Sequence, residues 1–78
     1  MKVKQYKEEM AFLNCLRKLN PIEIVGVGLL LGVTLLENEA QEVKIEDSEA
    51  LNRLLEGFKN ATERTRKRLL KIMKDATR

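Results

Sequence analysis

Hydrophobic and polar positions divide this chain of 78 residues into segments of different character. Over residues 3–19, apolar side chains recur three or four positions apart, which is the spacing of an amphipathic helix. Residues 24–36 form an almost unbroken apolar block. A segment that is apolar on every side has to be buried, either inside its own protein or against another chain. We therefore expect the apolar block to form the centre of the fold.

A helix start signal stands directly before the apolar block. Asn20 is suited to cap a helix, Pro21 is tolerated at the first helical position, and Glu23 can reach back to complete a capping box. These signals predict a helix from Pro21 to about Leu31, with Gly32 just past its end. The valines and glycines of the block are poor helix formers, so a buried strand is the competing interpretation.

The rest of the chain predicts a hairpin or loop and two further helices. Residues 33–46 contain two short alternating runs around a polar centre, which fits a short β-hairpin or an irregular loop. A cap at residues 47–48 opens a helix in which leucines recur at helical spacing. Asn60 and Glu63 repeat the capping-box pattern and open a last helix to about Ala76.

Together these elements predict one small all-α domain of three to four helices over residues 1–78. A chain of this length buries a modest core, and its single cysteine, Cys15, allows no internal disulfide. Oligomerisation is a common remedy for such a chain. The predicted core consists of Tyr6, Met10, Leu13, Leu16, Ile24, Val27, Leu30, Leu31, Leu51, Leu54, Leu55, Phe58, Leu69, Ile72 and Met73.

The glycines of the apolar block suggest close packing and not nucleotide binding. A dinucleotide fingerprint needs its third glycine where Leu31 stands, and a P-loop needs a Gly-Lys-Ser/Thr sequence that is absent here. Gly28 and Gly32 lie four residues apart, a spacing that lets another helix approach closely. With Leu29 and Leu36, they form the candidate helix-packing or oligomer contact.

Charge is unevenly distributed along the chain, although its net value is only +3. Residues 37–56 carry seven acidic and two basic side chains, whereas residues 57–78 carry eight basic and two acidic ones. A cationic helix face can neutralise phosphates of DNA or RNA, or lie on anionic lipid. Ordinary solvation of the helix is the alternative interpretation. The candidate face for an anionic partner consists of Arg64, Lys67, Arg68, Lys71 and Lys74.

The residue types argue against an enzyme and against a metal or cofactor site. The chain has no histidine, which is the usual general base, and one cysteine with no histidine gives no zinc ligand set. The acidic residues lack the spacing of a calcium-binding loop. The apolar block is shorter than the roughly 20 residues of a membrane span, and residues 1–20 lack a secretory pattern. We expect a non-enzymatic cytoplasmic protein without cofactor or metal, and no membrane partner.

Two segments resemble parts of regulatory proteins. Ile24-Val-Gly-Val-Gly-Leu-Leu-Leu-Gly-Val-Thr-Leu35 resembles the last helix of Cro/repressor-type helix-turn-helix domains, which ends in Leu-Gly-Val-Ser/Thr-Leu. Residues 54–58, followed by residues 66–73, are similar to the helical tail after such domains. The whole chain is similar to short bacterial reading frames of mobile elements, which have no assigned activity. Only residues 3–19 precede the matching helix, so the resemblance implies no recognition helix and assigns no DNA-contacting residues.

Two functional hypotheses follow from these observations. The first is a small interaction or regulatory module that associates with itself or with another protein, because its apolar surface exceeds what so few residues can enclose. The second is a nucleic-acid-associated regulator that uses the basic C-terminal helix.

Overall fold

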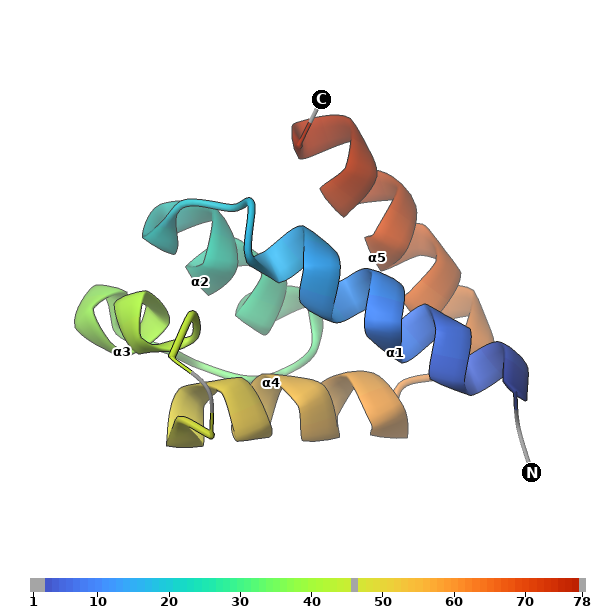
Figure 1. Ribbon diagram of the computed structural model, residues 1–78, viewed down its shortest axis with the longest axis horizontal. Helices are drawn as coiled ribbons and strands as arrows, with labels where there is room; N and C mark the ends of the chain where they lie inside the picture. Colours follow the sequence, from blue (N-terminus) through green and yellow to red (C-terminus); the bar gives the residue numbers. More distant parts are fainter. Residues whose placement is uncertain (1–2, 46, 78) are drawn as a thin grey trace.

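The computed structural model describes residues 3–45 and 47–77. Over these residues the chain forms five helices and no strand, so the all-α prediction is confirmed (Figure 1). The helices are α1 (Val3–Leu16), α2 (Pro21–Leu30), α3 (Glu37–Glu42), α4 (Glu49–Asn60) and α5 (Glu63–Ala76).

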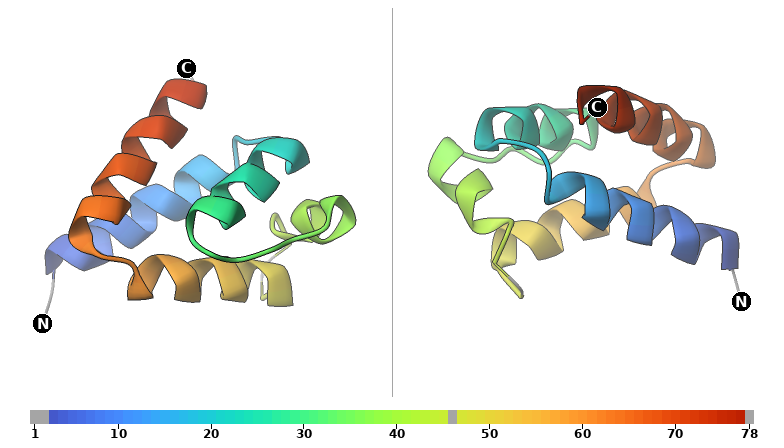
Figure 2. Two further views of the ribbon diagram at one scale, coloured as in Figure 1. Left: turned by 180° about the vertical axis from the view of Figure 1, so that it is seen from behind. Right: turned by 45° about the horizontal axis from the view of Figure 1, so that its top comes forward.

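The first and last helices lie side by side, and α4 supports them from one side. α1 packs against both α5 and α4, whereas the short α3 packs against α2 and α4. In Figure 1, α4 runs along the lower edge, α3 lies at the left, and α5 rises at the upper right. The views in Figure 2 show α2 and α3 at one end of the molecule and the first turns of α1 and α5 at the other.

The predicted start of α2 is confirmed. The Glu23 N–H donates to Asn20 Oδ1, and the Asn20 N–H donates to Glu23 Oε1, each at 2.9 Å. Pro21 occupies the first helical position. Two of the backbone donors that a helix start leaves unpaired are thereby satisfied within four residues of sequence.

The end of α2 is a Schellman turn built on two glycines. The Val33 N–H donates to the Gly28 carbonyl at 2.7 Å, and the Gly32 N–H donates to the Leu29 carbonyl at 3.2 Å. Gly32 has a φ of 74°, the left-handed conformation that glycine adopts at this position. A Cβ added to Gly28 would lie 2.5 Å from the Val33 carbonyl oxygen. Within the chain, Gly28 therefore admits the returning backbone, and Gly32 makes the turn.

Within residues 33–45 no hairpin forms: α3 occupies the centre, and the residues on either side of it are irregular. The Leu36 N–H donates to Glu39 Oε1 at 2.9 Å, which caps the first turn of α3. Ala40 and Val43, three residues apart, are both buried. This is helical spacing, and it decides the structure of the segment.

The predicted caps of α4 and α5 have different outcomes. Ser48 caps α4, and its Oγ accepts from the Leu51 N–H at 3.1 Å. Asn60 is the last residue of α4 and does not open α5, so that prediction is wrong. The cap of α5 is Thr62, whose Oγ1 accepts from the Thr65 N–H at 3.2 Å.

Side chains from every helix meet in one core. Phe12 of α1 and Phe58 of α4 stack at its centre, with ring centroids 4.3 Å apart and both side chains fully buried. The buried apolar residues are Phe12, Cys15, Leu16, Leu19, Ile24, Val27, Leu35, Ala40, Val43, Ala50, Leu54, Phe58, Leu69, Leu70 and Met73.

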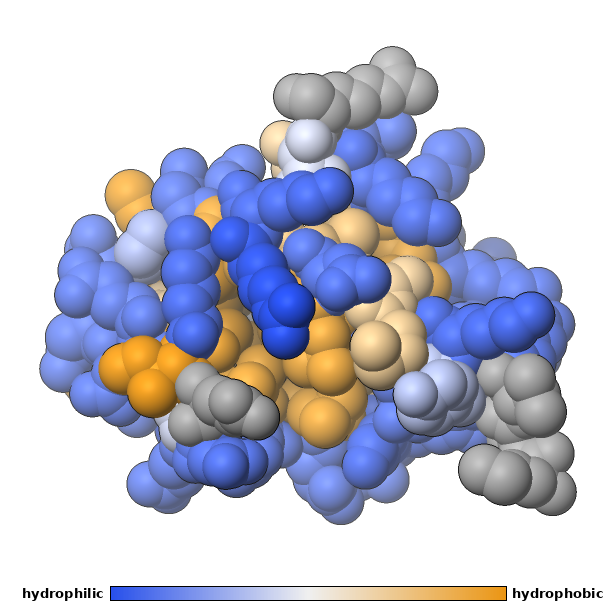
Figure 3. All heavy atoms as spheres, in the orientation of Figure 1, coloured by the Kyte–Doolittle hydropathy of each residue, from blue (hydrophilic) through white to orange (hydrophobic). Residues whose placement is uncertain are grey.

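Four residues of the predicted core lie at the surface instead. Tyr6 and Met10 are exposed because α1 turns the face of Phe12 inward. Leu30 and Ile72 are exposed because α2 and α5 direct other residues at the core. Figure 3 shows apolar surface in the middle of one face of the molecule, surrounded by hydrophilic side chains. The fold therefore leaves part of its apolar surface uncovered.

Candidate interaction surfaces

An apolar groove runs between α2 and α5. It consists of two adjoining hollows of about 270 and 180 Å³, which share Leu30 and Ile72 in their walls. We call this surface the α2/α5 groove. Its lining residues are Leu19, Glu23, Gly26, Val27, Leu30, Thr65, Arg68, Leu69, Ile72, Met73 and Ala76.

The groove exists because each of its helices has more apolar side chains than the core can take. The core receives Ile24 and Val27 from α2, and Leu30 is left 55% exposed. On α5, Leu69 and Met73 are buried, and Ile72 is left 46% exposed. Single exposed apolar side chains are ordinary on protein surfaces. These two line the same hollows from opposite helices and thus form one continuous apolar surface.

The two ends of the groove carry opposite charges. Glu23, at the start of α2, shares one hollow with Met73 and Ala76 near the end of α5. Arg68 and Thr65, nearer the start of α5, share the other hollow with Leu30. The two helices therefore run in opposite directions along the groove, with a carboxylate at one end and a guanidinium at the other. Arg68 is exposed and has no ion-pair partner among the residues that the structure describes.

The five basic residues predicted to share a face do so. Arg64, Lys67, Arg68, Lys71 and Lys74 are all exposed, and at helical spacing they span an arc of about 120° on α5. Lys67 Nζ lies 3.3 Å from Glu63 Oε1. The other four form no ion pair within residues 3–45 and 47–77. We call this surface the basic face of α5.

Arg66 is separated from the exposed basic residues of α5 and is largely buried against α1. Its Nε lies 3.1 Å from Glu8 Oε1 of α1, with side chains only 12% and 11% exposed. Its Nη1 also donates to the Ala61 carbonyl. A helical wheel of α5 places Arg66 toward the core side, but its partner on α1 becomes evident only from the fold. Arg66 thus joins the first helix to the last.

A second ionic link joins the same two helices at the surface. The Lys4 ammonium donates a hydrogen bond to Glu63, which also pairs with Lys67. The bond from Lys4, followed by that from Lys67, holds the pKa of the Glu63 carboxyl below its usual value. The hydrogen bond to Glu63 raises the pKa of Lys4. Because the folded-state pKa of Glu63 is the lower one, its ionised form favours folding above the ordinary pKa of a glutamate, and this contribution is lost as pH falls through the folded value.

The acidic helix α3 and the basic helix α5 lie on different sides of the molecule. The ion pairs of α5 are made with α1 or within α5 itself, and Arg53 of α4 pairs with Glu39 of α3 at 3.3 Å. Among the described residues, no ion pair joins α5 to the acidic segment 37–56. Figure 1 shows α3 and α5 at opposite sides of the fold.

The predicted helix-packing or oligomer contact is divided by the fold. Gly28 is buried beneath the chain at Val33. Leu29 and Leu36 are each 63% exposed, and Gly32 is exposed in the turn between them. The contact of these residues with another chain stays a prediction. None of the residues that line the α2/α5 groove belongs to this predicted contact, because the groove depends on the placement of α2 beside α5.

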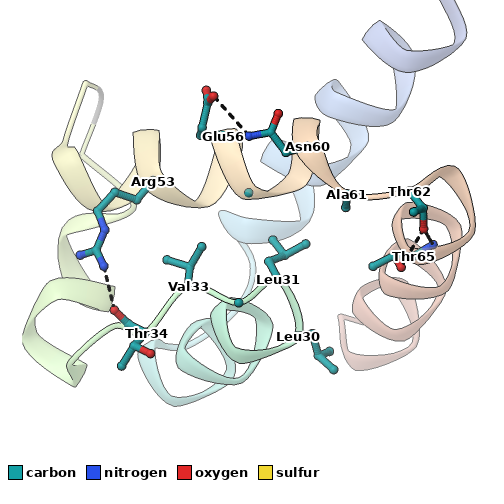
Figure 4. A pocket seen from close by; sticks show the side chains of 12 residues that line it. Leu30, Leu31, Val33, Thr34, Arg53, Glu56, Asn60, Ala61, Thr62 and Thr65 are labelled. Atoms are coloured by element: carbon teal, nitrogen blue, oxygen red, sulfur yellow. Dashed lines mark hydrogen bonds between the residues drawn. The ribbon is translucent and has the colours of Figure 1, made fainter.

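A third, polar hollow of about 840 Å³ lies between α4 and the loop after α2 (Figure 4). Its polar groups bond to their neighbours and do not converge on a common point. Arg53 Nη2 donates to the Thr34 carbonyl at 3.0 Å, and Asn60 Nδ2 donates to Glu56 Oε1 at 3.4 Å. Within the described part of the chain, no group of three His, Cys, Asp or Glu residues could hold a metal ion.

Comparisons with known proteins give no family for this chain. No protein-family model, curated protein or solved structure matches it. Among the residues that the structure describes, no helix is both long enough and apolar enough to cross a bilayer. Any functional inference therefore depends on the surfaces described above.

Proposed function

We propose that this chain is a non-enzymatic, cytoplasmic interaction module with a regulatory or accessory role, and that it self-associates through the α2/α5 groove. The observation that supports this proposal is the groove itself. Leu30 and Ile72 face each other across an apolar hollow and are about half exposed. Covering such a surface is favourable by roughly 25 cal/mol for each Å² of apolar area removed from water.

The charges at the ends of the groove favour a second copy as the occupant. A two-fold dimer makes every contact twice. If residue i of one copy touches residue j of the other, then residue j of the first copy touches residue i of the second. We place the two-fold axis in the plane of the interface, where it crosses the middle of the groove at right angles. The grooves of the two copies then run in opposite directions. Glu23 of each copy then lies at the end that holds the partner's Arg68. The apolar centres around Leu30 and Ile72 coincide, so the chain is complementary to itself.

Light scattering after size-exclusion chromatography tests self-association. At tens of micromolar, where association of moderate strength appears, we expect a mass of twice 9.0 kDa. Ile72→Glu should give the monomer mass, because a charge would be buried in the apolar centre of the interface. Circular dichroism should show that the variant keeps its helices, since Ile72 is half exposed.

The matched control is Ile45→Glu, which makes the same change at a side chain that is 61% exposed and lies outside the groove. It should leave the dimer intact. A wild-type chain that is monomeric throughout this concentration range contradicts the proposal. Equal loss of the dimer in both variants would show that the groove is not the interface.

Reversing the end charges tests the two-fold arrangement. Arg68→Glu places two like charges together at each end of the interface, and Glu23→Lys does the same with opposite sign. Each should weaken dimerisation about tenfold or more. The double variant Glu23→Lys/Arg68→Glu should regain most of the lost dimer affinity, because both ion pairs form again with their charges exchanged.

Two controls separate this effect from folding and from net charge. Glu23→Gln keeps a side chain that can complete the capping box, so it separates loss of the cap from loss of the charge. Arg64→Glu makes the same charge change as Arg68→Glu outside the groove and should leave the dimer intact. A double variant no stronger than the single ones would exclude the two-fold arrangement.

A further inference from the structure

The separation of charge on the molecule suggests a second surface, which shares only Arg68 with the groove. Four cations of the basic face, Arg64, Arg68, Lys71 and Lys74, are exposed and form no ion pair within the described chain. They extend over about 15 Å of α5, at 1.5 Å for each residue. The links that join α5 to α1 use Arg66, Glu63 and Lys4 instead. The free cations are therefore not needed for the packing of α5.

We propose that the basic face of α5 binds the phosphate backbone of duplex nucleic acid without reading its sequence. Cations along a helix face neutralise successive phosphates and release the counterions condensed on the duplex. The acidic α3, with Glu37, Glu39 and Glu42, lies on the other side of the fold from α5. Its negative charge orients the molecule, because a duplex repels that side and attracts the other.

The way α5 is packed favours nucleic acid over a lipid surface. A helix that lies on a membrane inserts its apolar side among the lipid chains. In α5 that side is already in the core, where Leu69 and Met73 are each 1% exposed and Leu70 is 8% exposed. What α5 presents to the outside is mainly its charged side, which suits phosphates at a polar surface.

The composition of α5 offers neither stacking on unpaired bases nor recognition of adenine. The helix contains no aromatic residue on which unpaired bases could stack. It also contains no Asn or Gln, the side chains that recognise adenine in the major groove. Phosphate contacts position a protein on a duplex but carry no sequence information. We therefore expect weak binding, with a dissociation constant of about 10⁻⁴–10⁻⁶ M at physiological salt.

Fluorescence anisotropy with a labelled short DNA duplex tests this proposal. Between about 50 and 200 mM salt, the logarithm of the binding constant should fall with the logarithm of salt with a slope of about −3 to −4, as expected for four neutralised phosphates. The double variant Arg64→Glu/Lys71→Glu should lose about a hundredfold or more in affinity at the low-salt end. Neither residue lines the groove.

The matched control is Lys44→Glu/Lys59→Glu, which changes the net charge by the same amount. Both lysines are exposed and lie outside α5, so this variant should lose far less affinity. Equal losses would overturn the proposal, because binding would then follow net charge and not the basic face. Absence of binding at low salt would overturn it too, as would binding to phosphatidylserine vesicles without binding to DNA. A monomeric chain that binds DNA would end the self-association proposal and support this one.

Discussion

Replacing Phe58 by alanine is expected to lower the free energy of unfolding by about 3–5 kcal/mol. The Phe58 ring is fully buried and stacks on that of Phe12, with an angle of 12° between the ring planes. The variant loses the transfer free energy of the ring and leaves a cavity between α1 and α4. A domain of this size is stable by only about 0.05–0.15 kcal/mol for each residue, so the substitution should remove a large part of its total stability.

Urea titration followed by far-ultraviolet circular dichroism measures this loss. The control is Ile22→Ala, which removes an apolar side chain that is 70% exposed. It should change the free energy of unfolding by no more than about 0.5 kcal/mol. Similar values for the two variants would mean that the ring pair does not lie at the centre of the core.

Gly28→Ala should destabilise the protein by about 1–3 kcal/mol, whereas Gly26→Ala should stabilise it by about 0.5–1 kcal/mol. The two glycines are separated by one residue of the same helix, and alanine is the better helix former at both. A Cβ at Gly28 would lie 2.5 Å from the Val33 carbonyl oxygen, whereas a Cβ at Gly26 would meet no atom within 4 Å. The Val33 backbone cannot easily yield, because its N–H is bonded to the Gly28 carbonyl.

Thermal unfolding of the two variants at low protein concentration provides the comparison. Low concentration matters because Gly26 lines the α2/α5 groove, where an added methyl group would also affect dimerisation. Opposite signs are the expected result. Stabilisation by both substitutions would show that the chain after α2 does not return over Gly28.

The parts of the fold that the sequence predicts well are those decided by neighbouring residues. The capping box at Asn20 and Glu23 lies within four positions, and its hydrogen bonds form as expected. The end of α2 at Gly32 is equally local. Helix α3 is not predicted by the sequence. The alternation of apolar and polar residues on either side of it indicates short strands and outweighs the helical spacing of Ala40 and Val43.

Features that depend on the crossing of distant helices could not be predicted. Phe12, and not Tyr6 or Met10, faces the core because α4 and α5 both lie on that side of α1. The basic face of α5 and the inward position of Arg66 follow from helical spacing alone, but the pairing of Arg66 with Glu8 of α1 depends on the fold. The α2/α5 groove forms because α2 lies beside α5. The periodicity within one helix does not predict which other helix will lie next to it.

The pairing of α1 with α5 has a consequence for the order in which the chain acquires its structure. Glu8 meets Arg66 across 58 positions of the sequence, and Lys4 meets Glu63 across 59. During synthesis α1 leaves the ribosome before its partner has been made, so the side of α1 that packs against α5 stays uncovered until residues 63–76 have followed it. When α1 then packs against α5, the chain between them closes into a large loop and loses conformational entropy. Until that moment the nascent chain is most exposed to aggregation and to chaperones.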